Sequence, residues 1–355
     1  MSFNKTMRAL EFDKHGGVDD LQLREIPTPQ PAAYEVLVKV NAASLNGFDP
    51  MILQGSTELK TPFPMVPGGD FAGEIVALGE RAGEPDPDAP EFLSLFDADR
   101  WKVGDRVAPF PFVMGEGMTG ETRRGALCEY ITMPVSNLIP IPDNVSDEDA
   151  ASLPIAYGTA YKMMYNVAKV RSRENVLILG ATGGVGTCAV QLAKAAGANV
   201  IAAGRGDWKV QKLKEIGADH VIDTANEDVI AACRDIVGKP RMMVPGRGVD
   251  LVINYIGGDT WSTSLKVIGH GGRMVTCGAS AGYLSETDLR YLWTYELQLL
   301  GSNGWTPGDQ MLLFGMVSRG ELKPIIQDVR SLADAPAAIQ DLIDRNVFGK
   351  IVIKP

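Results

Sequence analysis

The sequence predicts an α/β protein with two domains, one rich in β-strands and one built on a doubly wound parallel sheet. Its 355 residues suggest two domains, at roughly 150 residues per domain. Residues 1–146 show short alternating apolar runs separated by Gly- and Pro-rich turns, which is typical of strands. After residue 146, apolar strands alternate with helical patterns, and this order indicates a parallel sheet with crossover helices. Because 45% of the residues are hydrophobic and 22% charged, two cores can form.

The β-rich part contains four clear strand candidates. Strands are expected at 35–44, 70–79, 103–110 and 126–134. The acidic, Pro-rich segment 81–101 between them is expected to be an inserted surface loop.

The doubly wound part is expected to begin with a helix capped by Ser146, which Glu148 and Asp149 follow in the first turn. The remaining expected elements alternate in type along the chain. They are strands at 175–179, 199–204, 219–223, 250–257 and 273–278, helices at 188–197, 208–217, 309–322 and 336–346, and a closing strand at 349–355.

The charge balance and the cysteines exclude several functional classes. With 34 basic and 44 acidic residues the net charge is −10, which disfavours nucleic acid or an anionic membrane as the main partner. The N-terminus lacks the layout of a signal peptide, and no uncharged apolar run is long enough to span a membrane. Four scattered cysteines without a CxxC pair favour reduced thiols in a cytoplasmic protein, with a disulfide framework as the alternative.

The strongest motif is a glycine-rich turn in the segment 175–198. A strand leads into Gly180-Ala-Thr-Gly-Gly-Val-Gly186, and a helix follows. Gly183 would let the backbone approach a pyrophosphate, and Gly186 would let the helix pack on the strand. The helix N-terminus would present N–H groups to the phosphates. The turn therefore predicts a dinucleotide site that includes Thr182, Gly183, Gly184, Val185 and Gly186; the alternative is a tight turn without a ligand.

The end of the second strand suggests which dinucleotide is bound. No acidic residue at 203–206 could accept a hydrogen bond from a ribose 2′-hydroxyl, as an NAD site requires. Gly204 is followed instead by Arg205 and, four residues later, by Lys209, two cations that could bind a 2′-phosphate. We therefore expect NADPH, although both cations could be solvated surface charges and Asp207 could weaken the preference.

Several further motifs carry a family resemblance that covers nearly the whole chain. They are NGFD (46–49), PMVPGGDFAGEIVALG (64–79), VGDRV (103–107), LPIAYGTAY (153–161), the glycine turn, GADHVID (217–223), INYIGGDTW (253–261) and the closing GKIVI. Together they resemble the medium-chain dehydrogenase/reductase superfamily, and within it the quinone-oxidoreductase branch. The resemblance implies a GroES-like catalytic domain from residues 1–146 and 302–355, a Rossmann domain from 147–301, and an active site in the cleft between them.

Zinc-dependent alcohol dehydrogenases are the nearest alternative within the resemblance. They carry a Cys after the first strand pair, a Gly-His-Glu turn, and a third Cys or Asp near the domain junction. Here Asn46 stands at the first position, the turn is Gly68-Gly69-Asp70, and no Cys lies near Leu153. Without thiolate or imidazole ligands a catalytic zinc cannot be held, so no metal is expected.

The resemblance also implies which residues surround the reacting atoms. Asn46 would lie beside the nicotinamide, although it could equally be a turn residue, and Asp49 would brace that turn. Many relatives carry a Tyr where Met51 stands, so Tyr157 is the replacement candidate for a proton donor, with a buried core role as the alternative. The residues expected to line the cofactor site are Thr159, Tyr255, Gly278, Ala279, Ser302 and Asn303.

These observations favour a zinc-independent, NADPH-dependent reductase of quinones or α,β-unsaturated carbonyls. The alternatives are an enoyl-thioester reductase, a zinc-less alcohol or aldehyde oxidoreductase, and an NADPH-binding protein with a non-catalytic role. Arg123 and Arg124, in the Gly-rich and mobile-looking loop 115–126, could contact an anionic thioester or form an ordinary solvated pair. By resemblance the protein is expected to be a homodimer that pairs through the strand at 296–302.

Overall fold

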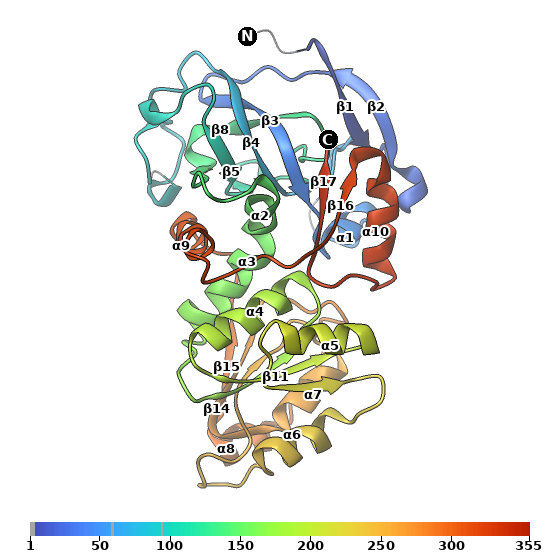
Figure 1. The fold of residues 1–355 in the computed structure, drawn as a ribbon, viewed down its shortest axis with the longest axis vertical. Coiled ribbons are helices and arrows are strands. Elements are labelled where there is room, and N and C mark those ends of the chain that lie inside the picture. Colours follow the sequence, from blue (N-terminus) through green and yellow to red (C-terminus); the bar gives the residue numbers. More distant parts are fainter. Residues whose placement is uncertain (1–3, 58–59, 94) are drawn as a thin grey trace. The chain divides into compact units, whose positions relative to one another are not determined.

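The computed structural model describes residues 4–57, 60–93 and 95–355, which form two compact units (Figure 1). The first unit combines Met1–Gly158 with Thr306–Pro355, and the second is Thr159–Trp305. The domain limits expected from the sequence lie at 146/147 and 301/302. The limits between the units fall 12 residues later at the first point (158 − 146) and 4 later at the second (305 − 301).

The first unit is built on a seven-stranded mixed sheet. Along its main path the strands follow the order β16-β17-β3-β4-β5-β9, and β8 pairs with β3 beside that path. Their bounds are β3 Glu35–Ser44, β4 Asp70–Leu78, β5 Arg106–Pro109, β8 Tyr130–Pro134, β9 Leu138–Pro140, β16 Ile326–Ser331 and β17 Lys350–Lys354. The four strands expected between residues 35 and 134 are all present.

Pairing of the chain's two ends makes the first unit discontinuous. The C-terminal strand β17 runs antiparallel to β3, with Val352 opposite Ser44, and parallel to β16. Ile351, Val352 and Ile353 are fully buried. Because a strand covered on both faces must bury every side chain, the sequence KIVIK reads as a nearly unbroken apolar run.

Smaller elements complete the first unit. Two-stranded sheets form from β1 (Thr6–Glu11) with β2 (Gln22–Pro27) and from β6 (Phe112–Val113) with β7 (Gly117–Met118). The α-helices are α1 Asp49–Gln54, α2 Asp147–Ser152, α9 Pro307–Ser318 and α10 Ala335–Ile343, and α3 Pro154–Tyr161 begins in this unit and ends in the second. The 3-10 helices are η1 Val18–Asp20, η2 Glu91–Leu93, η3 Ala98–Arg100, η4 Val135–Asn137 and η6 Leu332–Asp334. Ser146 caps α2 by accepting a hydrogen bond from Asp149 N, which confirms the expected helix start.

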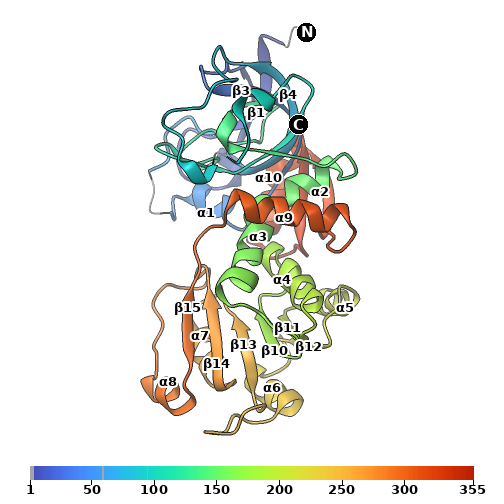
Figure 2. The same cartoon turned by 90° about the vertical axis from the view of Figure 1, so that its left-hand side faces the viewer.

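The second unit is a doubly wound sheet of six parallel strands (Figure 2). The strands lie in the order β12-β11-β10-β13-β14-β15. Successive strands are added on one side of β10 up to β12 and on its other side from β13 onward, and α/β sheets bind their ligands at such a switch point in the strand order. The strands are β10 Asn175–Leu179, β11 Asn199–Gly204, β12 His220–Asp223, β13 Val249–Ile253, β14 Ile268–Thr276 and β15 Gln298–Gly301. The helices are the π-helix η5 Lys162–Val167, α4 Gly184–Ala195, α5 Asp207–Glu215, α6 Val229–Val237, α7 Asp259–Leu265 and α8 Leu289–Tyr295.

Two segments are held more firmly than the sequence suggested. The segment 81–101 is not simply a surface loop, because Ala82, Leu93 and Trp101 are buried. Backbone hydrogen bonds join the loop 115–126 to the adjacent segment of the same chain around Gly68, among them one from Ala126 N to Gly68 O at 2.8 Å. A few buried apolar side chains hold the first segment and backbone hydrogen bonds hold the second, and amino-acid composition reveals neither kind of contact.

In the described part of the chain, no helix has the length and apolar character needed to cross a membrane. All four cysteines are unpaired thiols, and Cys128, Cys188 and Cys233 are buried. Burial raises the pKa of each of these three thiols, so they behave as small apolar side chains.

Candidate functional site

The glycine turn lies at the carboxyl end of β10, beside the reversal point of the parallel sheet. Gly180 adopts a positive φ of 68°, a conformation open to glycine at little cost. Gly183 is the N-cap of α4, and it caps the helix without a side-chain hydrogen bond. The first turn of α4 contains Gly184, Val185 and Gly186 and carries no acidic residue. Its backbone N–H groups and the positive end of the helix dipole suit an anion.

Two of the glycines lie closely packed against neighbouring atoms of the protein. A Cβ on Gly186 would lie 2.4 Å from the carbonyl oxygen of Gly180, so only glycine lets α4 approach the turn. A Cβ on Gly204 would lie 2.6 Å from the side chain of Thr182. Thr182 therefore packs over the end of β11 and links the two strand ends.

Gly183 differs because the protein leaves its side open. A Cβ there would meet only Gly180 O, at 3.8 Å, which is an ordinary contact. The fold itself does not need glycine at this position, which agrees with the expected approach of a pyrophosphate to the backbone.

Tyr255 joins the glycine turn to the end of β13. Its hydroxyl donates a hydrogen bond of 2.7 Å to Gly180 O, and burial raises its pKa. The hydroxyl thus braces the turn, a role that the sequence did not reveal. The loop after β14 completes this edge, because Ser280 N donates to Tyr255 O and the Cα of Ala279 lies close to Gly257.

The remaining expected cofactor residues follow neighbouring strand ends. Gly278 follows β14 and donates weakly to Thr276 Oγ1, at 3.4 Å. Ser302 and Asn303 follow β15, and Ser302 N donates to Thr276 O at 2.8 Å. The Ser302 hydroxyl is buried and has no hydrogen-bond partner among the described residues. Thr159, on α3, is partly exposed.

The two cations expected at the end of β11 have different surroundings. Arg205 is exposed, whereas Lys209 is only 7% exposed, and burial lowers its pKa. Asp223, at the end of β12, accepts hydrogen bonds from Gly206 N and Ala225 N, which keep its pKa low. Its charge also attracts Arg205. Sequence reasoning missed this carboxylate because it belongs to the next strand.

A second group of polar residues forms a buried centre in the first unit. We define the polar centre as Asn46, Asp49, Asp70 and Lys350, of which Asn46 is the most exposed at 6%. Asn46 Nδ2 donates to Asp70 Oδ2 at 2.9 Å, and Lys350 Nζ donates to Asn46 Oδ1 at 2.5 Å. Asn46 N donates to Asp49 Oδ2 at 2.7 Å, which is the turn brace expected for this aspartate.

Strand register assembles the polar centre. Ser44 lies opposite Asp70 on β4 and opposite Val352 on β17. Continuing the antiparallel register past the end of β3 places Lys350 across from Asn46. The backbone of α3 adds one more contact, because Ile155 N donates to Asp70 Oδ1 at 3.0 Å.

Burial controls the ionisation of the polar centre. It raises the pKa of Asp49 to about 7 and also raises that of Asp70, whereas it lowers the pKa of Lys350. The attraction between Asp70 and Lys350 opposes both of their shifts. Sequence reasoning singled out Asn46 and Asp49 but missed Lys350, which is 304 positions away from Asn46. The only available signal was the GKIVI motif itself.

Tyr157 lies in the interior of the first unit. It is fully buried, and its hydroxyl accepts a hydrogen bond of 2.8 Å from Ile325 N. These contacts support the core role named above as its alternative, rather than that of a proton donor.

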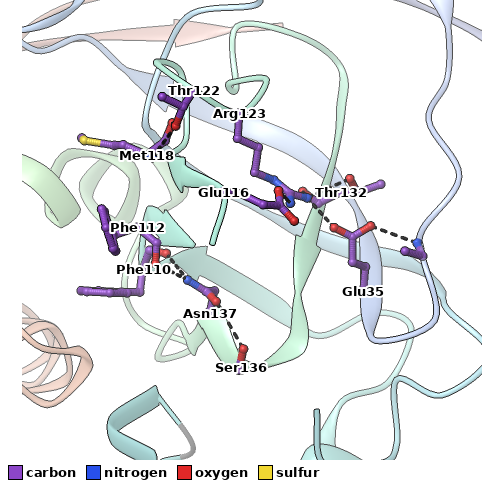
Figure 3. Close-up of polar contacts among 11 residues, drawn as sticks. Glu35, Phe110, Phe112, Glu116, Met118, Thr122, Arg123, Thr132, Ser136 and Asn137 are labelled. Carbon is purple, nitrogen blue, oxygen red and sulfur yellow. Dashed lines mark hydrogen bonds and ion pairs between the residues drawn. The ribbon is translucent and has the colours of Figure 1, made fainter. Parts of the chain in front are cut away.

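Arg123 is occupied by protein partners (Figure 3). Its side chain is 11% exposed, pairs with Glu35 at 2.5 Å and with Glu116, and donates to Thr132 O. Arg124 pairs with Glu11 at 2.8 Å. Arg123 is therefore not the solvated surface charge considered above, and it is unsuited to holding an anionic substrate, whereas the Arg124 side chain is half exposed.

The open side of Gly183 generates a sharp test of the phosphate turn. Gly183→Ala is expected to leave the midpoint of thermal unfolding unchanged within about 2 °C, because the added Cβ meets only ordinary contacts. The same methyl group should weaken NADPH binding at least about tenfold, a loss of roughly 1.4 kcal/mol measured by titration calorimetry. Gly17→Ala, at an exposed site with no atom near its Cβ, serves as the matched control. Unchanged NADPH affinity in Gly183→Ala would contradict the assignment of the turn.

Family models match both units of the chain. Residues 32–143 match the alcohol dehydrogenase GroES-like domain, and residues 184–317 match the zinc-binding dehydrogenase domain. The first match covers β3 through β9, and the second covers the helix of the glycine turn and the strands that follow it.

Whole-chain relatives agree with these matches. The quinone oxidoreductase of Mus musculus is 28% identical, with 98% of each chain covered. The acryloyl-coenzyme A reductase of Sulfurisphaera tokodaii is 26% identical over 94% of this chain and 96% of its own. A solved NAD-dependent alcohol dehydrogenase is 30% identical, with a TM-score of 0.85 over 98% of this chain and 100% of that one. The chain belongs to the medium-chain dehydrogenase/reductase superfamily, and it is an NAD(P)H-dependent oxidoreductase.

Proposed function

We propose that this oxidoreductase is zinc-independent and transfers a hydride from NADPH to a quinone or an α,β-unsaturated carbonyl. The polar centre is the observation that carries the proposal. It offers a buried amide donor at Asn46, where zinc-dependent relatives have a cysteine, and it contains no thiolate or imidazole. Among the described residues, no group of three His, Cys, Asp or Glu side chains could hold a metal ion. The residues present therefore do not fit the zinc that the family description implies.

The chemistry follows from the charge that develops on the substrate. NADPH, when bound, supplies the hydride. As the substrate accepts it, negative charge accumulates on the carbonyl oxygen, and an oriented donor in a water-poor site stabilises that charge. Asn46 has two Nδ2 hydrogens and gives one to Asp70, so the second can face the oxygen. A proton from solvent then completes the hydroquinone or the saturated carbonyl.

Two related activities remain as alternatives. Reduction of an enoyl thioester is favoured by the similarity to the acryloyl-coenzyme A reductase, but Arg123 is already paired within the protein. Alcohol or aldehyde chemistry is favoured by the alcohol dehydrogenase neighbour, but the donor set lacks zinc ligands.

A substrate panel tests the proposal. NADPH oxidation is measured with quinones, enones, enoyl-coenzyme A thioesters and aldehydes, and we expect the highest kcat/KM with a quinone or an enone. Asn46→Ala should lower kcat about 100-fold because it removes the donor to the developing oxyanion. Asn41→Ala on β3, which removes an amide that bonds Asp147 instead, is the matched control and should retain activity. Highest turnover with enoyl thioesters or aldehydes, or no turnover despite tight NADPH binding, would refute the proposed substrate class.

The cofactor preference rests on Arg205, because Lys209 is largely buried. We expect NADPH to bind at least about tenfold more tightly than NADH, which corresponds to roughly 1.4 kcal/mol. Arg205→Ala should remove most of this difference by weakening NADPH binding alone. Arg234→Ala, an exposed arginine on α6 of the same unit, should leave both dissociation constants unchanged. Tighter binding of NADH to the unmodified protein would exclude the preference.

We further propose that the protein forms a homodimer through β15. This strand is the edge of the parallel sheet, and an edge strand offers unpaired backbone groups. The segment just before it exposes large apolar side chains, with Leu284 at 95%, Tyr283 at 74% and Trp293 at 67%. Sedimentation equilibrium should give twice the mass of one 38.1 kDa chain, and Trp293→Glu should shift the equilibrium toward monomer. Met242→Glu, a substitution at another exposed position, is the control, and a monomer at micromolar concentration would refute the dimer.

A further inference from the structure

The polar centre holds a lysine where its charge is costly. Lys350 is 1% exposed and Asp70 is fully buried, although both residue types are almost always at the surface unless they are paired. The ammonium belongs to the first residue of β17, so its position is fixed by the strand.

The space for a metal ligand at the turn is filled by the protein. Gly69 stands where zinc-dependent relatives have a histidine. A Cβ on Gly69 would lie 2.6 Å from Ile155 Cδ1 and 3.1 Å from Thr119 O, so a side chain at this position would have to move the tip of Ile155 and would press on the Thr119 carbonyl. Gly69 itself supplies no metal ligand, and the cation of the polar centre is the Lys350 ammonium.

The ammonium lies closer to the amide than to the carboxylate. Lys350 Nζ is 2.5 Å from Asn46 Oδ1 but 3.5 Å from Asp70 Oδ2. A buried ion pair offsets its desolvation cost only when its geometry is close, and 3.5 Å is a loose contact for such a pair. The shorter contact to Asn46 indicates that the Lys350 ammonium acts mainly on the Asn46 amide.

The two charges together determine how the Asn46 amide is oriented. Its oxygen faces the ammonium and its nitrogen faces the carboxylate, so each end meets the opposite charge. Turning the amide over would place the NH2 group against the ammonium and the oxygen against the carboxylate, and both contacts would be repulsive. Donation to Oδ1 also polarises the amide, which strengthens the remaining N–H as a donor.

We propose that Lys350 is a positioning residue that holds and polarises the Asn46 amide, so that its free N–H stabilises the substrate oxygen in place of a metal. This inference rests on the proposed function of Asn46. It assigns to a lysine at the C-terminal end of the chain the electrostatic task that a metal ion performs in zinc-dependent relatives.

The decisive experiment compares Lys350→Met with the neutral pair Lys350→Met/Asp70→Asn. The single variant leaves the buried Asp70 unpaired, so it should lose both stability and activity. The double variant removes both charges while keeping an oxygen acceptor for Asn46 Nδ2, so the midpoint of thermal unfolding should recover. We expect its kcat to stay roughly 10- to 100-fold below that of the unmodified protein, with the dissociation constant of NADPH unchanged. Recovery of kcat in the double variant would show that Lys350 only balances charge, and would overturn the proposal.

Lys354→Met is the matched control on the same strand. Lys354 is about half exposed and pairs with Glu148 at the surface, so its removal should change neither kcat nor the unfolding midpoint appreciably. An equal loss of kcat in Lys354→Met would show that the strand, and not the ammonium, is responsible.

A measurement that does not depend on catalysis tests the role of Lys350 independently of the proposed function. The side-chain amide resonance of Asn46, assigned by its disappearance in Asn46→Ala, should exchange slowly with solvent in the unmodified protein. It should shift in the double variant. If no substrate on the panel is reduced but the amide behaves in this way, the proposed function fails and the positioning by Lys350 stands. Solvent exchange as fast as that of an exposed asparagine in the unmodified protein would overturn the inference without any variant.

Discussion

The register of three strands, β17, β3 and β4, controls the chemistry of the first unit. Ser44 on β3 faces Asp70 on one side and Val352 on the other, and this alignment brings Lys350 and Asn46 together. A shift of one residue in either ladder would turn Asp70 or Lys350 to the opposite face of the sheet. Such a shift would also take a buried charge away from its partners in surroundings lined by the apolar side chains of β17, which is costly. Hydrophobic pairing of the chain's two ends therefore sets the electrostatics of the polar centre.

Close packing has the corresponding role in the second unit. Gly186 lets α4 approach the turn after β10, and the Tyr255 hydroxyl fixes the carbonyl group of Gly180 in that turn. The first backbone N–H groups of the helix are thereby held at the end of the sheet before any ligand arrives. A preorganised anion site spends little of its binding energy on ordering the protein.

The two units stabilise charge in different ways, one with backbone dipoles and the other with paired buried side chains. The phosphate turn uses neutral backbone dipoles, which cost little to expose and need no buried countercharge. The polar centre uses real charges in the interior, and these are tolerable only because Asp70, Lys350 and Asn46 satisfy one another. Each of these three residues needs the other two as partners, and they come together only because β17, from the C-terminal part of the chain, pairs with β3.

Local sequence patterns determined the element types, the parallel sheet with its glycine turn, and the positions of Asn46 and Asp49. These features follow from hydrophobic periodicity and from glycine conformations, which act over a few residues. Tertiary structure alone decided which charges meet. It buried Lys209 and Tyr157, occupied Arg123 with Glu35 and Glu116, set Asp223 beside Gly206, and brought Lys350 across 304 positions to Asn46. Burial and pairing of a charge depend on neighbours that are distant in sequence, so composition and motif spacing cannot determine them.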